Sequence, residues 1–424
     1  MKETIMLGTV EAPAAPASVE ETRLDIGLLA DLALKTLYFA GNAPGETLAA
    51  QMALPLQVTS EVLGLLRREQ LCVVTGGAGI SVGGLDYSLT TAGLERASSA
   101  LSLNGYVGPA PVPLSEYFEA VQRQSIQSVE VTREEIEDSM SHLVLAQRTV
   151  DFIGQAVSAK KAMLIYGSSG NGKSTAAESL GQAFKGTILI PYAVEVMHQV
   201  IQIFDPSTHE TVELPESTDR RMLDKRWVLI KRPLVFAAGE LAASHLELVL
   251  DPVHKTYEAP IQMKANGGLL VIDDFGRQHL DAAYLLNRWI VPLEKGVDNL
   301  SLQNGARFQA PFDVVPIFVT NRQPADLADE AFLRRIRYKI EISPPTAENF
   351  TEIMKRECAR NGIVYTDQAA NYLLQEHFES VGRPLRGCHP RDILEAVAAA
   401  ARYQGREPVL TPDAIDEACA NYFA

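Results

Sequence analysis

The sequence predicts an α/β fold in which helices cover both faces of a parallel β-sheet. Between residues 131 and 344, short apolar segments alternate with helical ones, which is the pattern of buried parallel strands. One of these segments, Met163 to Tyr166, leads directly into a glycine-rich loop. Residues 345–424 are helical throughout by their spacing of apolar residues. We therefore expect an α/β core at 131–344 with a helical lid at 345–424.

The composition is that of a globular protein. The 424 residues are 46 % hydrophobic and 21 % charged, and the formal net charge is −15. Such an acidic balance disfavours non-specific binding to nucleic acid. No apolar run reaches the roughly 18 residues of a membrane span, and no secretory signal is visible at the start. The four cysteines form no C-x-x-C pair. We expect a cytoplasmic protein that does not insert into a membrane.

The N-terminal part is expected to hold a small unit of its own. Residues 1–19 contain alanines and prolines without periodicity and are expected to be a disordered tail. Residues 20–105 show three helices, a hairpin with the glycine-rich tip 76–79 and a closing helix, which is typical of a winged helix. The segment 87–94 resembles the end of the wing in bacterial winged-helix regulators. The three prolines within 106–130 indicate a Pro-rich linker or a strap that runs along the surface.

Further elements are expected in the core. An amphipathic helix is predicted for 136–158, and sheet strands are predicted for 188–192, 269–272 and 314–320. A long insert at 197–265 precedes the third of these strands, with extra strands expected at 227–236 and 245–250. Basic residues make this insert locally positive, which we interpret as a solvated face; they are Arg220, Arg221, Lys225, Arg226, Lys231 and Arg232.

The glycine-rich loop matches the pattern G-x-x-x-x-G-K-[ST] between a strand and a helix. Its glycines allow backbone N–H groups to converge on phosphate oxygens, and the helix that follows presents its positive end to the anion. Lys173 is expected to reach the β- and γ-phosphates, and the Ser174 hydroxyl is expected to bind Mg²⁺. The sequence thus predicts ATP and Mg²⁺ as ligands, held by Gly167, Ser168, Ser169, Gly170, Asn171, Gly172, Lys173, Ser174 and Thr175.

Polar side chains follow two of the predicted strands. Asp273 and Asp274 end the strand 269–272, and Asn321 ends the strand 314–320. Ligands of α/β proteins bind at the carboxyl ends of the parallel strands. Asp273 is expected to hold Mg²⁺, and Asp274 is expected to orient or deprotonate the attacking water. Asn321 is expected to contact the γ-phosphate or that water.

Arginines follow in two places. The segment 332–337 contains Arg334, Arg335 and a third arginine, and an arginine that reaches the γ-phosphate can stabilise phosphoryl transfer. Arg391 lies at the start of an apolar helix in the lid and is expected to contact phosphate within the same subunit. A solvent-exposed basic surface is the alternative interpretation for each of these arginines.

In this order the motifs resemble the AAA+ family of ring-forming ATPases, over residues 131–424. The resemblance implies that Asn321 is the first sensor, that Arg391 is the second sensor, and that Arg334 or Arg335 is a finger acting on a neighbour's nucleotide. It also implies a homo-oligomer, usually a hexameric ring. The family commonly has Glu where this chain has Asp274, so the shorter side chain could make hydrolysis slow.

A second resemblance concerns residues 297–308. Asn304-Gly305 between alternating segments predicts a hairpin. A hairpin here resembles the insert before the first sensor in MoxR-like ATPases and enhancer-binding transcription activators. In those proteins such loops press on partner macromolecules in the pore of the ring. The glycine-phenylalanine signature of the transcription activators is absent, so their function is not inferred.

Three functions fit these motifs. The first is a MoxR-like remodeller or chaperone that acts on a protein partner through the N-terminal unit. The second is a DNA-directed ATPase, such as a transposition or replication helper, and the third is a nucleotide-gated scaffold with little turnover. Residues 20–105 carry five basic and nine acidic residues, whereas a winged helix that reads DNA presents a basic face. The sequence therefore favours a protein partner over nucleic acid.

Overall fold

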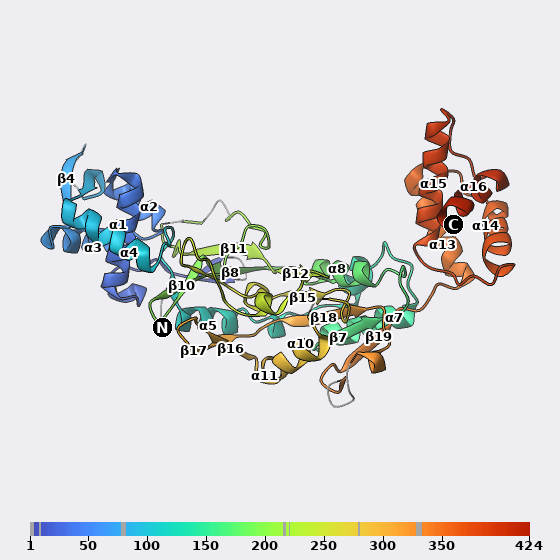
Figure 1. Ribbon diagram of the computed structural model, residues 1–424, viewed down its shortest axis with the longest axis horizontal. Coiled ribbons are helices and arrows are strands. Elements are labelled where there is room, and N and C mark those ends of the chain that lie inside the picture. Colours follow the sequence, from blue (N-terminus) through green and yellow to red (C-terminus); the bar gives the residue numbers. More distant parts are fainter. Residues whose placement is uncertain are drawn as a thin grey trace.

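The computed structural model describes residues 4–7, 10–77, 82–214, 218–219, 221–278, 280–327 and 333–424. An α/β part forms the middle of the molecule (Figure 1). The N-terminal helices lie at one end of it, and the C-terminal helices lie at the other.

The central sheet has five parallel strands in the order β12-β15-β18-β7-β19. Most of their side chains are buried, as a sheet covered on both faces requires. The strands are β7 (Met163–Tyr166), β12 (Leu234–Ala237), β15 (Leu269–Ile272), β18 (Val315–Thr320) and β19 (Tyr338–Glu341).

Alternate side chains of these strands enter two different apolar clusters, because successive residues of a strand point to opposite faces. In β7, Ile165 packs on one face with Leu180 of α8, whereas Leu164 packs on the other with Leu286 of α10. The helices of this part are α6 (Arg133–Ser139), α7 (Gln147–Ser158), α8 (Lys173–Ala183), α9 (Ile261–Lys264), α10 (Ala282–Arg288) and α11 (Ile290–Lys295).

The single helix predicted for 136–158 is wrong, because α6 and α7 are separate. Two serines at the end of α6 bond back to the helix: the Ser139 hydroxyl donates to the Ile136 carbonyl and the Ser141 hydroxyl to that of Asp138, each within 2.8 Å. Such side chains compete with the helical backbone pattern.

The predicted parallel strand 188–192 also needs correction. It forms β8 (Thr187–Pro191), which pairs antiparallel with β11 (Trp227–Lys231) outside the central sheet. The expected strand 227–236 is two strands, since Pro233 separates β11 from β12. Because β12 is an edge strand of the central sheet, the segment 197–265 is not wholly an insert.

The remaining strands of the middle part form a second sheet and a hairpin. The second sheet has the order β13-β14-β10-β9-β6, and the expected strand 245–250 contributes only a 3-10 turn and β13. The expected hairpin is present as β16 and β17. The bounds are β6 (Val112–Pro113), β9 (Ala193–Val196), β10 (Gln199–Gln202), β13 (Val249–Leu250), β14 (Tyr257–Glu258), β16 (Val297–Ser301) and β17 (Arg307–Pro311).

The expectation of a disordered tail at 1–19 is wrong for the described residues. Strands β1 (Thr4–Leu7) and β2 (Val10–Pro13) pair with one another, and Ala12 is only 2 % exposed. The Ala15 N–H donates to the Met222 carbonyl at 2.7 Å. Val10 and Ala12 of β2 belong to the apolar cluster that also contains residues of β8 and β11.

The expectation of a linker at 106–130 is also wrong. This segment contains β6 and the helix α5 (Leu114–Arg123). Tyr117 of α5 is 1 % exposed and its hydroxyl donates to the Met263 carbonyl. An amphipathic helix with a buried face is part of a domain rather than a tether.

The N-terminal unit has the helices and the hairpin that the sequence indicates. Two strands of the hairpin, β4 and β5, are joined by β3 in the order β3-β5-β4. Residues 78–79 of its expected tip lie outside the described residues. The bounds are α1 (Ile26–Ala40), β3 (Asn42–Pro44), α2 (Gly45–Gln51), α3 (Leu56–Arg68), β4 (Cys72–Gly77), β5 (Leu85–Leu89) and α4 (Thr91–Leu103).

The C-terminal region is helical, as predicted, and its helices enclose an apolar cluster of their own. Thr346, Thr366 and Thr411 each cap a helix by accepting a backbone N–H. The helices are α13 (Ala347–Asn361), α14 (Asp367–Leu374), a π-helical turn (Gln375–Glu379), α15 (His389–Tyr403) and α16 (Pro412–Tyr422). Within the described ranges, every helix is too short or too polar to cross a membrane.

Candidate functional site

The glycine-rich loop, hereafter the P-loop (residues 167–174), connects β7 to α8 as predicted. Gly167, Gly170 and Gly172 have φ values of 136°, 82° and 81°, which side chains with a Cβ rarely adopt. A Cβ atom on Gly167 would lie 2.4 Å from the Ile342 carbonyl oxygen. Glycine is therefore required for the course of this loop, and α8 begins directly behind it at Lys173.

Lys173 lies within the P-loop and is 5 % exposed. Its Nζ donates to the Ser168 carbonyl at 2.9 Å. Burial lowers the pKa of Lys173, whereas the carboxylates of Asp273 and Asp274 act in the opposite direction. The ammonium is therefore held near the two acids in a partly desolvated place that favours an additional anion.

The two acids and Asn321 meet beside the P-loop. β15, β18 and β7 are neighbours in the sheet, so the residues after their carboxyl ends share one edge. The Asn321 side-chain amide donates to Asp274 Oδ1 at 3.4 Å. Ser174, in the first turn of α8, and Asp273 are half-buried, while Asp274 and Thr175 are exposed. A hydroxyl and a carboxylate are oxygen ligands of the kind that Mg²⁺ prefers, so the donor set at this edge fits that ion.

Asp274 has an unusual backbone conformation. Its φ is 50°, in the left-handed region, and its N–H donates to Asp273 Oδ1 at 2.8 Å. Gln278 supports this turn by donating from one amide nitrogen to the carbonyls of Asp273 and Ala238. Non-glycine residues hold such conformations where the surrounding structure imposes them, often at functional sites.

The arginines predicted at 334–335 lie near α11. The Arg335 Nε is 3.2 Å from Glu294 Oε1, and the Arg335 side chain is 32 % exposed. Arg334 is exposed, while residue 332 of the same segment lies outside the described residues. Both arginines belong to the segment between β18 and β19 rather than to the P-loop edge itself.

Arg391, the predicted second sensor, lies in the first turn of α15. Its guanidinium donates to Asp392 Oδ1 from Nε and Nη2, at 3.0 and 2.8 Å. The other oxygen of Asp392 accepts the Tyr422 hydroxyl at 2.8 Å. Arg391 is therefore paired within the lid.

A contact that the sequence did not indicate joins the lid to the P-loop. The residues before α15, 386–388, are called the lid loop here. The Cys388 N–H donates to the Gly170 carbonyl at 2.8 Å, and the Gly387 N–H donates to Asn171 Oδ1 at 3.0 Å. The Asn171 Nδ2 in turn donates to Ser168 Oγ at 2.8 Å. Asn171, 6 % exposed, thus connects the phosphate-binding backbone to the lid.

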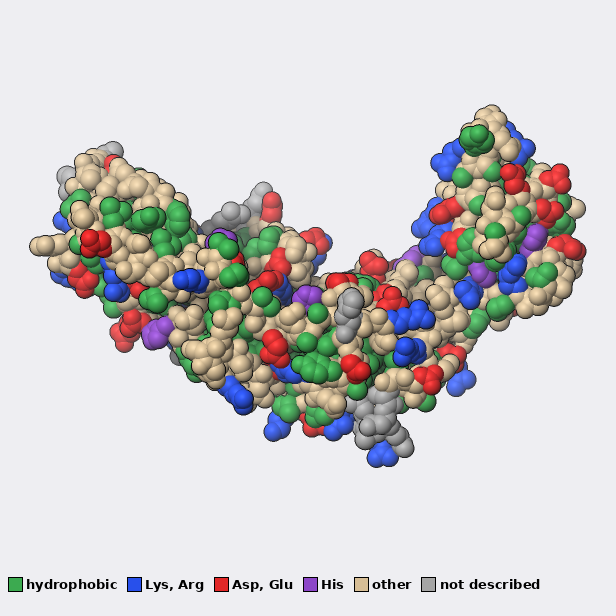
Figure 2. Space-filling view, in the orientation of Figure 1, with side chains coloured by type: hydrophobic (Ala, Val, Ile, Leu, Met, Phe, Trp, Pro, Cys, Tyr) green, Lys and Arg blue, Asp and Glu red, His purple; other side chains and the backbone are tan. Residues whose placement is uncertain are grey.

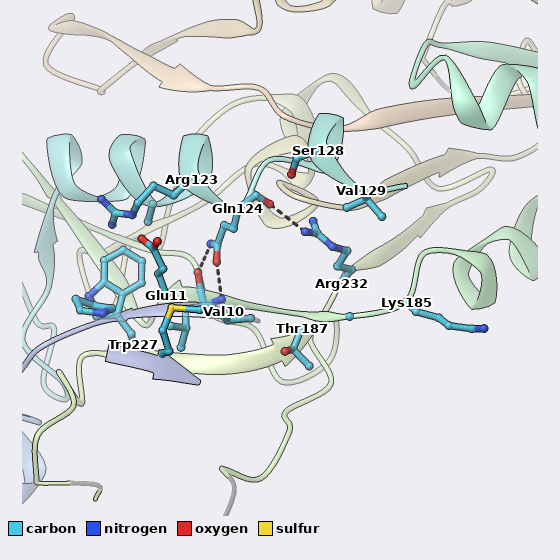
Figure 3. Close-up of a pocket in the computed structure, with 15 residues that line it drawn as sticks. Val10, Glu11, Arg123, Gln124, Ser128, Val129, Lys185, Thr187, Trp227 and Arg232 are labelled. Atoms are coloured by element: carbon cyan, nitrogen blue, oxygen red, sulfur yellow. Dashed lines mark hydrogen bonds between the residues drawn. The ribbon is translucent and has the colours of Figure 1, made fainter. Parts of the chain in front are cut away.

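A separate cavity of about 430 Å³ lies between β2, α5, β8 and β11 (Figure 3). The described residues that line it include Trp227 and Arg232 but none of the predicted site residues. Arg232 donates to the carbonyls of Gly267 and Gln124, so its guanidinium supports backbone there. This cavity is distinct from the P-loop edge.

The strand order and the P-loop after β7 define the α/β core. With acids after β15, a polar residue after β18 and a helical lid, the chain has the α/β fold of a P-loop NTPase.

Comparisons with known proteins place only the lid in a family. Residues 346–421 match a domain of unknown function (DUF8689), and no curated protein matches the chain. Among solved structures, NtrX from Brucella abortus is 12 % identical, with a TM-score of 0.38 over 84 % of this chain and 60 % of NtrX. The RuvB Holliday junction branch migration motor of Thermotoga maritima is 14 % identical, with a TM-score of 0.36 over 65 % of this chain and 68 % of RuvB. A mutant of Thermotoga maritima RuvB is 12 % identical, with a TM-score of 0.35 over 70 % of this chain and 71 % of the mutant's chain.

Proposed function

We propose that this protein is an Mg²⁺-dependent ATPase that forms a ring and hydrolyses ATP at sites shared between neighbouring subunits. The observation that carries the proposal is the meeting of Lys173, the acids after β15 and Asn321 at one edge of the sheet. Each side chain supplies a different part of phosphoryl transfer: charge, a base and an orienting amide.

In this proposal each residue of the site has its own role in ATP binding or hydrolysis. Backbone N–H groups of the P-loop and Lys173 bind the phosphates, and Lys173 gives up its bond to the Ser168 carbonyl to do so. Ser174 and Asp273 hold Mg²⁺, which when bound neutralises charge on the phosphates. Asp274 accepts a proton from water, and Asn321 orients the water and that carboxylate.

The ring belongs to the proposal because the family resemblance assigns the finger to Arg334 or Arg335, which would act on the nucleotide of a neighbouring subunit. Arg334 and Arg335 are carried on a segment beyond β18, and Arg391 is paired with Asp392. An arginine supplied by a neighbouring subunit stabilises the transferring phosphoryl group. A hexamer is the arrangement that the family resemblance implies.

A protein partner, remodelled or assembled by the ring, is the proposed target. In the N-terminal unit, which the sequence predicts to be a winged helix, Arg67 of the third helix interacts with the Tyr87 hydroxyl rather than only with solvent. Residues 20–105 carry nine acidic and five basic residues, and this net negative charge disfavours contact with the phosphate backbone of DNA. The hairpin β16–β17 packs its side chains Leu300 and Phe308 into the core, which leaves its tip at 303–305 to meet a partner.

The proposal is tested by steady-state ATPase activity of the full chain, with particle size measured in the same nucleotide. Lys173→Ala is expected to weaken ATP binding about 100-fold, because it removes a charged hydrogen bond to phosphate. Lys185→Ala, an exposed lysine just after α8, is the matched control and is expected to behave as the wild type. Equal ATP binding by wild type and Lys173→Ala would refute the site. A stable ring that binds ATP without turnover would instead favour the scaffold function.

A further inference from the structure

The lid loop brings a second arginine of the lid to the P-loop. Two backbone hydrogen bonds, from Gly387 and Cys388, hold this loop against Asn171 and Gly170. Arg386 directly precedes them. A Cβ atom on Gly170 would lie 3.6 Å from Arg386 Cδ, so the side chain of Arg386 passes next to the phosphate-binding backbone.

The backbone of Arg386 is fixed from the lid side as well. Its N–H donates to Nδ1 of His389 at 3.2 Å, and the His389 ring is 4 % exposed among Phe378, Tyr422 and Phe423. The lid loop is therefore anchored at both ends, in the lid and in the P-loop. Arg386 itself is exposed, so its guanidinium can reach a ligand that solvent can enter.

Arg391 is less suited to the same task. Two hydrogen bonds to Asp392 engage the Nε and Nη2 atoms of its guanidinium, and that carboxylate offsets part of its charge. A planar guanidinium binds phosphate best when its donor fork and charge are available. Figure 2 shows further Lys and Arg side chains, with Asp and Glu side chains among them, on the side of the lid that faces the hollow above the core.

We propose that Arg386, rather than Arg391, is the cation of the lid that binds the phosphates of ATP. This inference rests on the proposed ATPase function. It assigns a phosphate-binding residue to the lid loop, with Asn171 positioning that loop.

The test is calorimetric titration of the full chain with a non-hydrolysable ATP analogue and Mg²⁺. Arg386→Gln is expected to weaken binding at least about tenfold, the value of a charge-assisted hydrogen bond. Arg391→Gln and the control Arg402→Gln, which removes another exposed charge of the lid, are expected to change binding less than about threefold. Arg386→Lys is expected to restore part of the loss.

The salt dependence of binding separates phosphate contact from a structural role. If Arg386 touches phosphate, the wild type loses affinity with salt more steeply than Arg386→Gln does. If Arg391→Gln loses binding of the ATP analogue and Arg386→Gln keeps it, this inference is overturned. The proposed ATPase function would remain intact. Failure of the wild type to bind, or equal binding by Lys173→Ala, would instead refute the proposed function and the inference with it.

Discussion

At the scale of single residues, Asp274 has both a strained backbone conformation and the side chain that we propose as the general base. Its left-handed φ of 50° presents a carboxylate to Asn321 at 3.4 Å. Holding such a conformation costs free energy of order 1–3 kcal/mol, which the bonds around Asp273 and Gln278 offset. The strained backbone thus places the Asp274 carboxylate at the edge of the sheet, where the proposed general base is needed.

We expect Asp274→Asn to bind ATP as the wild type does and to lower kcat at least about 100-fold, since an amide cannot accept the proton. Single-turnover hydrolysis with nucleotide affinity measured in parallel checks this. Asp326→Asn is the control, because that acid lies beyond β18 and is exposed. A kcat unchanged by Asp274→Asn would remove the general base from the scheme.

His389 gives the lid a pH dependence. Burial, with the charges of Arg386 and Arg383, lowers its pKa to about 4, while Asp392 acts the other way. The unfolded chain has the ordinary value near 6.5 and takes up the proton first as the pH falls. His389 therefore contributes full stability above pH 6.5, and this is lost progressively between pH 6.5 and about 4.

The expected loss is on the order of 3 kcal/mol at pH 4. His389→Phe keeps an aromatic ring beside Phe378 and removes the titration. We therefore expect its free energy of unfolding to fall less between pH 6.5 and 4.5 than that of the wild type, measured by urea unfolding. His245→Phe, on an exposed turn of the middle part, serves as the control. Parallel pH profiles for wild type and His389→Phe would contradict this account.

At the scale of elements, one of the two hydrogen bonds between the P-loop and the lid loop depends on the side-chain amide of Asn171. Asn171→Ala removes the acceptor of the Gly387 N–H and the donor to Ser168. We expect faster hydrogen exchange at Gly387, because its N–H becomes exposed to solvent. Ser169→Ala, an exposed neighbour in the P-loop, is expected to leave that exchange unchanged. Protection of Gly387 that survives Asn171→Ala would show that the lid loop is held elsewhere.

The elements that the sequence predicts well are those whose signal is local. The P-loop, the acids after β15 and the capping threonines of the lid each depend on a short stretch of chain. The errors concern pairing between distant segments. Nothing in 187–191 shows that its partner is 227–231, and nothing in 10–13 shows that this segment will pack against 187–191.

In the candidate site, too, features with a local sequence signal were predicted, and a contact between distant segments was not. Lys173, Asp274 and Asn321 were predictable because each follows a strand of the sheet. The lid loop was not, because its contact joins residues more than 200 positions apart. Its one signal was Gly387 before an apolar helix, and Arg386 beside it could have been considered together with Arg391.

At the scale of the whole molecule, the shared site predicts complementation between two inactive variants. Arg335→Ala keeps its own P-loop, and Lys173→Ala keeps its arginines. We expect each variant alone to be inactive, and mixed assemblies to regain part of the ATPase activity. The same experiment with Arg334→Ala decides which arginine is the finger. Mixtures that stay inactive, although the subunits co-assemble, would contradict sharing.

The N-terminal unit is joined to the middle part through a buried arginine. The expectation of a solvated basic face is wrong for Arg226, which is 0 % exposed and pairs with Asp224 at 2.7 Å. Its Nη1 donates to the carbonyls of Thr22 and Pro111. We expect Arg226→Ala to lower the free energy of unfolding by about 3–5 kcal/mol, because buried acids lose their partner. Chemical denaturation checks this, with the exposed neighbour Lys225→Ala as control. A change below about 1 kcal/mol would show that the pair is dispensable.

Arg226 also determines how the N-terminal unit can meet a partner. A unit on a flexible tether samples many orientations, and ordering it on binding costs conformational entropy. Here the segment 106–130 contains the folded helix α5, and the Arg226 guanidinium bonds to the carbonyls of Thr22 and Pro111 in the chain that precedes this helix. If the N-terminal unit binds the proposed protein partner, its surface is therefore already oriented before binding, and little conformational entropy is lost in ordering it.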